Sequence, residues 1–121
     1  MSSLKDSVPE VDFSVALEAS SVSKATPGYL AAAGGRIDST AASGTYYIQF
    51  MNAASLPADG TVTFLLAPQK IQHTQNTDSP FDVDIKREYI YASTGIVWCV
   101  SSTEFTKTIS GAVASVTVLV K

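Results

Sequence analysis

Apolar and polar residues alternate with a period of two along much of this chain, which is typical of β-strands with one buried face. The stretch from 45 to 66 shows this most clearly and predicts two strands separated by an excursion of turn residues at 53–60. Within the excursion, Pro57 restricts its own φ angle and Gly60 permits a positive φ. The apolar positions of the two expected strands are Tyr46, Ile48 and Phe50, then Val62, Phe64 and Leu66.

The same alternation begins near the N-terminus. Residues 1–10 are small and polar, and we expect them to form a flexible arm in front of a domain at 11–121. Val11, Phe13, Val15 and Leu17 alternate with polar or small residues. This pattern predicts a strand with these four side chains facing inward, continuing weakly to Lys24.

Further strands follow from the remaining segments. We expect strands at 29–37 with a bulge or bend at Gly34-Gly35, at 81–86 with a charged outer face, and at 113–120. The polar stretch 66–78 predicts a long connection or a weak edge strand. Residues 96–100 are apolar at every position, which predicts a central strand covered on both faces or one that meets another subunit.

These segments predict an all-β, single-domain antiparallel β-sandwich of seven to eight strands, with a jelly roll as the preferred arrangement. The length of 121 residues suits one domain. Charged residues make up only 16% of the chain, against about a quarter in an average protein. A surface with so few charges favours a protein that packs into an assembly.

Charge and composition argue against several functional classes. The net charge is −3, and the basic residues are scattered, so we expect no nucleic-acid partner. No apolar stretch is long enough to span a membrane, and the N-terminus lacks the apolar segment of a secretion signal. The one cysteine cannot form an internal disulfide.

The candidate reactive residues do not form a recognisable catalytic set. His73 is the one histidine of the chain, and its polar neighbours predict an exposed loop residue, although a hydrolase triad would have to use it. Cys99 follows Trp98 in an apolar run and is expected to be an inert core residue. Gly34-Gly35 lacks the spacing of a phosphate-binding loop. We therefore expect no enzyme.

Two groups of side chains leave a binding role open. Asp78, Asp82 and Asp84 could approach a cation, but solvated charges on an outer strand face are the simpler interpretation, so we assign no metal site. Four tyrosines could form a platform for stacking on carbohydrate, although core and interface packing is the commoner role of such residues. They are Tyr46, Tyr47, Tyr89 and Tyr91. No cofactor is expected.

Two sequence blocks resemble a known family. The first, Tyr46-Tyr-Ile-Gln-Phe-Met-Asn-Ala-Ala-Ser-Leu-Pro-Ala-Asp-Gly60, resembles a Tyr-Ile-Gln-(aromatic)-x-(Asn/Asp)-Ala-x-x-Leu-Pro-Ala-Asp-Gly block. The second, Thr94-Gly-Ile-Val-Trp-Cys-Val-Ser-Ser-Thr103 with Thr106-Lys-Thr-Ile109, resembles a Gly-Ile-Val-x-Cys-x-Ser-Ser-Thr-x-x-x-Lys-Thr-Ile block. Both blocks occur together in small proteins encoded among the virion genes of tailed bacteriophages.

This resemblance implies a structural role in the virion. Small β-sandwich phage proteins of this size often are capsid cement or decoration proteins, which sit as trimers on the capsid surface and bind the major capsid protein. The resemblance therefore implies a homotrimer, made in the host cytoplasm, that stabilises contacts between capsid subunits. It also leaves open a tail, collar or fibre component, including a glycan-binding knob that recognises a receptor.

Overall fold

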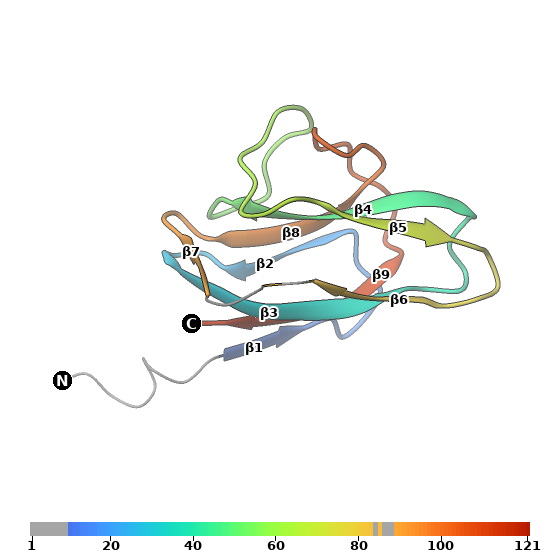
Figure 1. Cartoon of the computed structure of the whole chain (residues 1–121), viewed down its shortest axis with the longest axis horizontal. Helices are drawn as coiled ribbons and strands as arrows, with labels where there is room; N and C mark the ends of the chain where they lie inside the picture. The colour runs from blue at the N-terminus through green and yellow to red at the C-terminus, as the bar shows by residue number, and fades with distance from the viewer. Residues whose placement is uncertain (1–9, 84, 86–88) are drawn as a thin grey trace.

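The chain forms two antiparallel β-sheets that pack face to face, as a computed structural model describes for residues 10–83, 85 and 89–121 (Figure 1). Nine strands make up the described part, which contains no helix and hence none able to cross a membrane. Sheet A comprises β1 (Glu10–Phe13), β3 (Gly28–Ile37), β6 (Ser79–Val83), β7 (Ile90–Ala92) and β9 (Ala114–Val120). Sheet B comprises β2 (Ser20–Lys24), β4 (Gly44–Asn52), β5 (Gln69–His73) and β8 (Ile96–Ser101).

The strand order is that of a jelly roll. Four antiparallel pairs are nested around the middle of the chain: β4 with β5, β3 with β6, β2 with β8, and β1 with β9. Wrapping this long hairpin brings β9 beside β3 and β8 beside β4, which gives the orders β1-β9-β3-β6 and β2-β8-β4-β5. The short β7 adds to the edge of β3. The predicted β-sandwich is thus confirmed, with nine strands in place of seven to eight.

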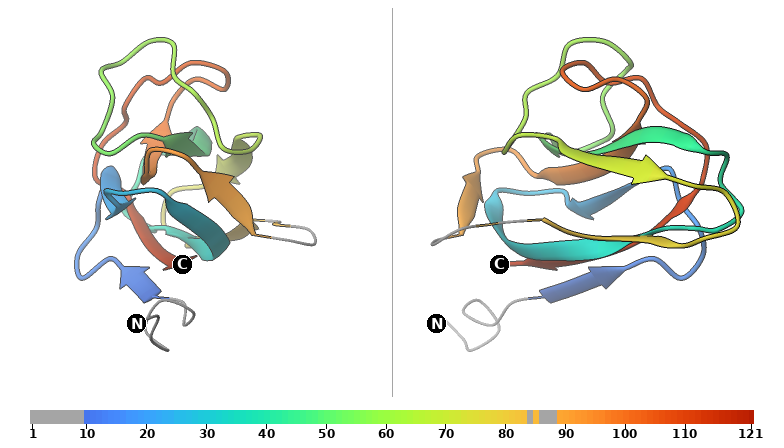
Figure 2. Two further views of the ribbon diagram at one scale, coloured as in Figure 1. Left: turned by 90° about the vertical axis from the view of Figure 1, so that its left-hand side faces the viewer. Right: turned by 45° about the vertical axis from the view of Figure 1, so that its right-hand side comes forward.

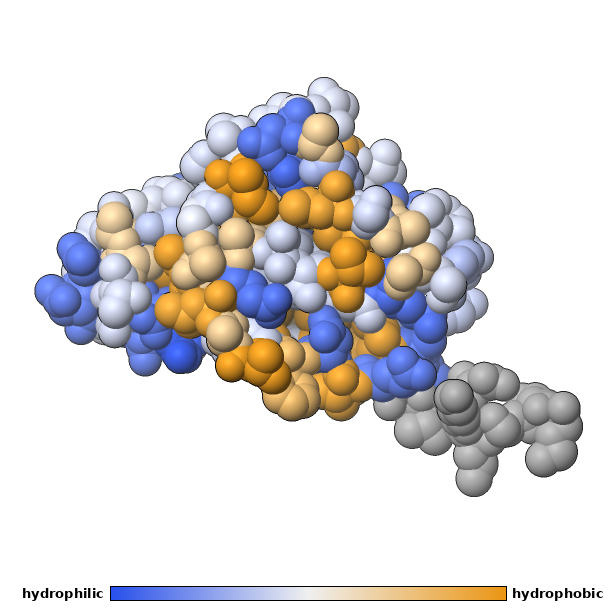
Figure 3. All heavy atoms as spheres, turned by 180° about the vertical axis from the view of Figure 1, so that it is seen from behind, coloured by the Kyte–Doolittle hydropathy of each residue, from blue (hydrophilic) through white to orange (hydrophobic). Residues whose placement is uncertain are grey.

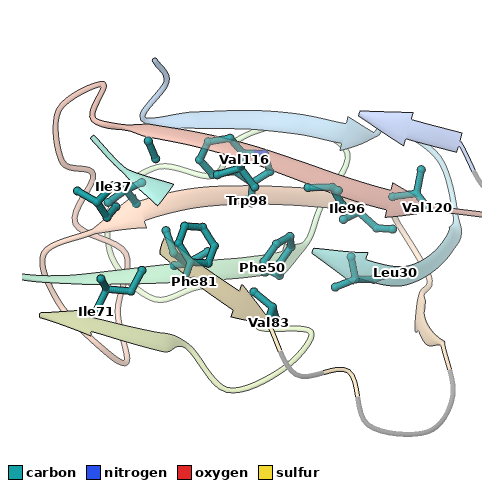
Figure 4. Close-up of a cluster of buried hydrophobic side chains, with 14 of the residues drawn as sticks. Leu30, Ile37, Phe50, Ile71, Phe81, Val83, Ile96, Trp98, Val116 and Val120 are labelled. Atoms are coloured by element: carbon teal, nitrogen blue, oxygen red, sulfur yellow. The ribbon is translucent and has the colours of Figure 1, made fainter. Parts of the chain in front are cut away.

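The main core lies between the two sheets (Figure 4). Trp98 and Phe50 extend from sheet B toward sheet A, and each has about 1% of its surface exposed. They meet Leu30, Phe81, Val83, Val116 and Val120 from sheet A. Alternating positions supply these side chains, so the period of two seen in the sequence is the period of burial.

A second, smaller core covers the outer face of sheet B. Two long loops, 53–68 between β4 and β5 and 102–113 between β8 and β9, stand side by side over that face (Figure 2). Their side chains Val62, Phe64 and Ile109 pack on Met51, Val97 and Cys99. Both faces of β8 are therefore covered by its own chain, which is the first of the two alternatives predicted for residues 96–100.

The prediction for the N-terminal strand is wrong about the buried face. Pairing of β1 with β9 places Val11 opposite Leu119 and Phe13 opposite Thr117, on the outer face of sheet A. Their exposed fractions are 59% and 61%. A period of two shows that a strand has two faces but does not show which one is buried.

The segment that contains this strand also divides between the two sheets. After β1 the chain crosses to sheet B, where β2 begins at Ser20. Val15, on the crossing, is 90% exposed and Leu17 is half-buried, so neither extends the expected inward face. Glu10 belongs to β1, and the rest of the expected arm, residues 1–9, lies outside the described residues.

Two further predictions need correction. Residues 62–66 do not form a strand; loop 53–68 makes only single bridges there, as between Met51 and Phe64. Gly34 and Gly35 pair regularly, and the irregularity of β3 falls between Leu30 and Ala32. A Cβ atom on Gly35 would lie 2.1 Å from the Ser115 carbonyl oxygen, so close approach of the backbone requires this glycine.

Candidate functional site

A pocket lined by tyrosines opens at one end of sheet A. Tyr29 on β3, Tyr91 on β7 and Tyr89 just before β7 line it, together with Lys24 and Lys121. These residues come from the end of β2, the start of β3, the region of β7 and the position after β9, which lie at the same end of the sandwich in Figure 1. The pocket encloses about 540 Å³. We call this group the tyrosine pocket.

Strand pairing holds the residues of the tyrosine pocket in place. Tyr29 and Lys121 exchange two backbone hydrogen bonds, of 2.8 and 2.9 Å, and Tyr91 is opposite Tyr29 on β7. Their neighbours Leu30 and Val120 are buried in the core, so these three side chains project from the outer face of sheet A. A regular backbone therefore positions the pocket.

The three aromatic rings are tilted toward one another. The ring centroids of Tyr29 and Tyr91 are 5.2 Å apart, and those of Tyr29 and Tyr89 are 6.5 Å apart. The interplanar angles are 54° and 58°, so the rings form an open cup. Lys121 Nζ lies 4.8 Å from the centre of the Tyr89 ring, within the range of a cation–π contact.

The structure divides the four tyrosines that the sequence suggested as a platform. Tyr46 and Tyr47 lie on β4 of sheet B, and the Tyr46 hydroxyl donates to the Ala42 carbonyl oxygen at 2.7 Å. Of these four, Tyr89 and Tyr91 belong to the tyrosine pocket. The sequence did not suggest Tyr29, Lys24 or Lys121 as members of this site. The Tyr-x-Tyr spacing of 89–91, which places both rings on one side of a strand, was the signal that could have indicated part of it.

A second feature of sheet A is an exposed apolar edge. Val11 and Phe13 on β1 and Val15 just after it are all more than half exposed, and we call these three residues the β1 apolar edge. A shallow apolar groove beside it is lined by Val11, Ala32 and Leu119. Apolar residues also gather along the lower margin of the face seen in Figure 3, the side on which sheet A lies. No described loop covers this face as the two long loops cover sheet B.

His73 has a structural position that the sequence did not predict. It is only 4% exposed, and its Nδ1 is 2.7 Å from Ser79 Oγ while its Nε2 is 3.2 Å from the Ala41 carbonyl oxygen. The Tyr46 ring meets it edge-on at 5.9 Å. Pairing of β5 with β4 draws this residue under the 38–43 loop, so the expectation of an exposed loop histidine is wrong.

Cys99 takes the core position expected of it, and the acidic residues lie elsewhere. Cys99 is fully buried, and burial raises the pKa of its thiol to about 11. Asp82 is exposed on β6, and Asp78 accepts from Arg36 Nη1 at 3.4 Å and from the Ser39 amide at 2.8 Å. Asp84 lies outside the described residues. Within the described ranges no three His, Cys, Asp or Glu residues gather to hold a metal ion.

The two blocks that carry the family resemblance meet in space beneath the two long loops. Gln49, from the first block, is fully buried, and its Nε2 donates to the carbonyl oxygens of Thr103, Glu104 and Thr106 at 2.9–3.0 Å. Its Oε1 accepts from Cys99 Sγ at 3.4 Å. The first block thus fixes the path of loop 102–113, and these residues have a structural role.

An ion pair joins the same two loops at their far ends. The buried Lys107 ammonium contacts the Asp59 carboxylate, and Gly60 and Lys107 exchange two backbone hydrogen bonds. Gly60 has a φ of 126°, as its position in the turn predicted. The residues of both blocks therefore hold the loops rather than surround an open cleft.

Two carboxylates predict how stability depends on pH. Hydrogen bonds from Thr40 and Arg36 lower the pKa of Asp38 from 3.8 to about 2, and Lys107 with the Ile109 amide lowers that of Asp59. A depressed folded-state pKa stabilises the fold above the unfolded value and loses that effect as the pH falls. Urea unfolding should therefore show constant stability above pH 5 and a decline from pH 4 to pH 2. Asp38→Asn should flatten part of this decline.

Comparisons with known proteins add no relative: no protein-family model, curated protein or solved structure matches this chain.

Proposed function

We propose that the protein is a capsid cement or decoration protein of a tailed bacteriophage, which binds the outside of the capsid and stabilises contacts between major capsid subunits. The observation that carries this proposal is the bare outer face of sheet A, with the β1 apolar edge exposed on it. Large exposed apolar side chains grouped on one face are typical of an interaction surface. The resemblance to phage virion proteins supplies the kind of partner.

The shape of the molecule supports docking by this face. Sheet B is covered by loops held by Gln49 and Lys107, whereas sheet A presents small residues, Ala32 and Gly34, beside Val11 and Leu119. A flat face with small side chains allows a partner to approach closely. A stable interface buries about 1,600 Å² in total. Repetition over many symmetric copies multiplies even a weak contact.

The positions of the potentially reactive residues support a non-catalytic role. The side chains of His73 and Cys99 are buried and form hydrogen bonds within the protein, so neither is placed to reach a substrate from solvent. The role proposed here requires only surfaces that bind a partner protein.

The protein is expected to be a homotrimer, and light scattering coupled to size-exclusion chromatography measures its mass directly.

The first test is the copy number of the chain in purified phage particles, by mass spectrometry and imaging. Many copies arranged with capsid symmetry are expected. Absence from the particle, or only a few copies at one vertex or on the tail, would contradict the cement role.

The docking surface gives a second prediction. The double substitution Val11→Ser with Phe13→Ser should change the free energy of unfolding by no more than about 1 kcal/mol, because both side chains are more than half exposed. The variant should nevertheless fail to occupy particles that lack the native protein. Phe105→Ser is the matched control, since Phe105 is 70% exposed but lies in loop 102–113 over sheet B. Equal occupancy by both variants would show that the β1 apolar edge is not the docking surface.

A tail, collar or fibre component that recognises a host glycan is the second candidate. The tyrosine pocket favours it, because exposed aromatic rings beside polar groups suit the apolar faces and hydroxyls of a sugar. A glycan array probed with the isolated protein tests this role. Absence of glycan binding together with many capsid-bound copies would exclude it.

A further inference from the structure

We propose that the tyrosine pocket binds an acidic saccharide, with a pyranose ring against Tyr29 and Tyr91 and its carboxylate between Lys24 and Lys121. This inference rests on the receptor-recognition candidate of the preceding section and names its class of ligand. It does not depend on the cement role, because a protein on the particle surface can carry both functions.

The size and lining of the pocket fit a small ligand with a ring. Its volume of about 540 Å³ falls within the range of about 300–1,000 Å³ that is usual for small-molecule sites. Tyr29, Tyr89 and Tyr91 are 43%, 47% and 55% exposed, so part of each ring is available to a ligand. The rest of each ring is packed against its neighbours, which limits the entropy lost on binding.

The angles between the rings favour a sugar over a flat aromatic ligand. A planar base stacks with its face parallel to a ring. Here the rings of Tyr89 and Tyr91 are both tilted by more than 50° from that of Tyr29, so neither of them forms a parallel slot with Tyr29. A puckered pyranose ring can direct C–H groups at tilted aromatic faces while its hydroxyls reach the phenol oxygens.

The charge of the pocket favours an anion. Lys24 and Lys121 supply two ammonium groups, and no carboxylate side chain is among the described residues that line the pocket. Lys121 Nζ lies over the Tyr89 ring, so it is held at the rim. A Cβ atom on Gly28 would lie 2.4 Å from Lys24 Cε, which shows that the stem of Lys24 rests on Gly28, another residue that lines the pocket.

The test measures binding of tri-galacturonic acid to the isolated full chain by titration calorimetry or by ligand-observed NMR. The fully methyl-esterified trimer is the neutral control with the same rings, and a hepta-glutamate peptide is the anionic control without rings. The acid should bind up to about fivefold more tightly than its ester, which is the upper size expected for losing an exposed charge pair. It should also bind more tightly than the peptide.

Three variants identify the groups responsible. Tyr91→Ala should weaken binding about fivefold to tenfold, as for loss of one aromatic contact, whereas Tyr91→Phe should retain most of it. Lys24→Gln combined with Lys121→Gln should abolish the preference for acid over ester. Phe105→Ala is the control aromatic residue outside the pocket and should bind as the native chain does.

Three results would overturn the inference: no binding of the acid at millimolar concentration, equal binding of the peptide, or binding unaffected by Tyr91→Ala. A failed saccharide titration beside full occupancy of the capsid would reject this inference and leave the cement role standing. Saccharide binding by a chain absent from the capsid would reject the cement role alone.

Discussion

Replacing Trp98 by alanine should lower the free energy of unfolding by about 3–5 kcal/mol, the largest effect expected of a single core substitution in this chain. Trp98 is 1% exposed and lies at the centre of the core between the sheets (Figure 4). Its removal leaves a cavity that the paired strands around it cannot close, because β8 is held by β2 on one side and β4 on the other.

Urea unfolding followed by far-ultraviolet circular dichroism measures this loss. Tryptophan fluorescence serves for the native chain, since Trp98 is its one tryptophan. Trp98→Phe is the matched control and should lose less, because the phenyl ring fills part of the cavity. A loss below about 1 kcal/mol for Trp98→Ala would contradict the buried position.

Replacing Gln49 by alanine should have the second largest effect, about 2–4 kcal/mol, because it removes several buried hydrogen bonds and leaves the Glu104 carbonyl oxygen without a donor. The Gln49 amide group is shared by three carbonyl oxygens of loop 102–113, at Thr103, Glu104 and Thr106. Without it, the Glu104 carbonyl oxygen loses its donor and Cys99 loses its acceptor, whereas the Thr103 and Thr106 carbonyl oxygens keep hydroxyl donors from Ser101 and Thr103.

The loss should be concentrated in one region. Hydrogen exchange of the amides in loop 102–113 should become faster, while exchange in β3 stays slow. Gln49→Glu is the isosteric control: at pH 7 its carboxylate would face the same carbonyl oxygens and should destabilise the chain at least as much as alanine does. A neutral effect of Gln49→Glu would show that the amide does not bridge the loop.

The sequence predicts the sheets better than it predicts which strands meet. Alternation identified β4 and β9, and a continuous apolar run identified β8, because each of these strands has neighbours on both sides in its sheet. The strand β1 lies at an edge, and its apolar side faces outward. Nothing within the segment 11–17 distinguishes these two cases, since only the partner strand decides the face.

The candidate sites depend on tertiary contacts in the same way. His73 sits among polar residues in the sequence, yet the pairing of β4 with β5 buries it beside Ala41 and Ser79. Tyr91 was recognised as a possible binding residue, but its companions Tyr29 and Lys121 are distant in the sequence. They come together only because β3 pairs with β7 on one side and with the end of the chain on the other.

The nested pairing of strands has a consequence for the synthesis of the chain. When residues up to 83 have emerged from the ribosome, the β4–β5 and β3–β6 pairs can form, but β1 and β2 still await β9 and β8. Pairing between distant segments is slow and leaves strand edges open in the meantime. The nascent protein can therefore form only its inner strand pairs at first, and its first and last strands close the structure together once β9 has emerged.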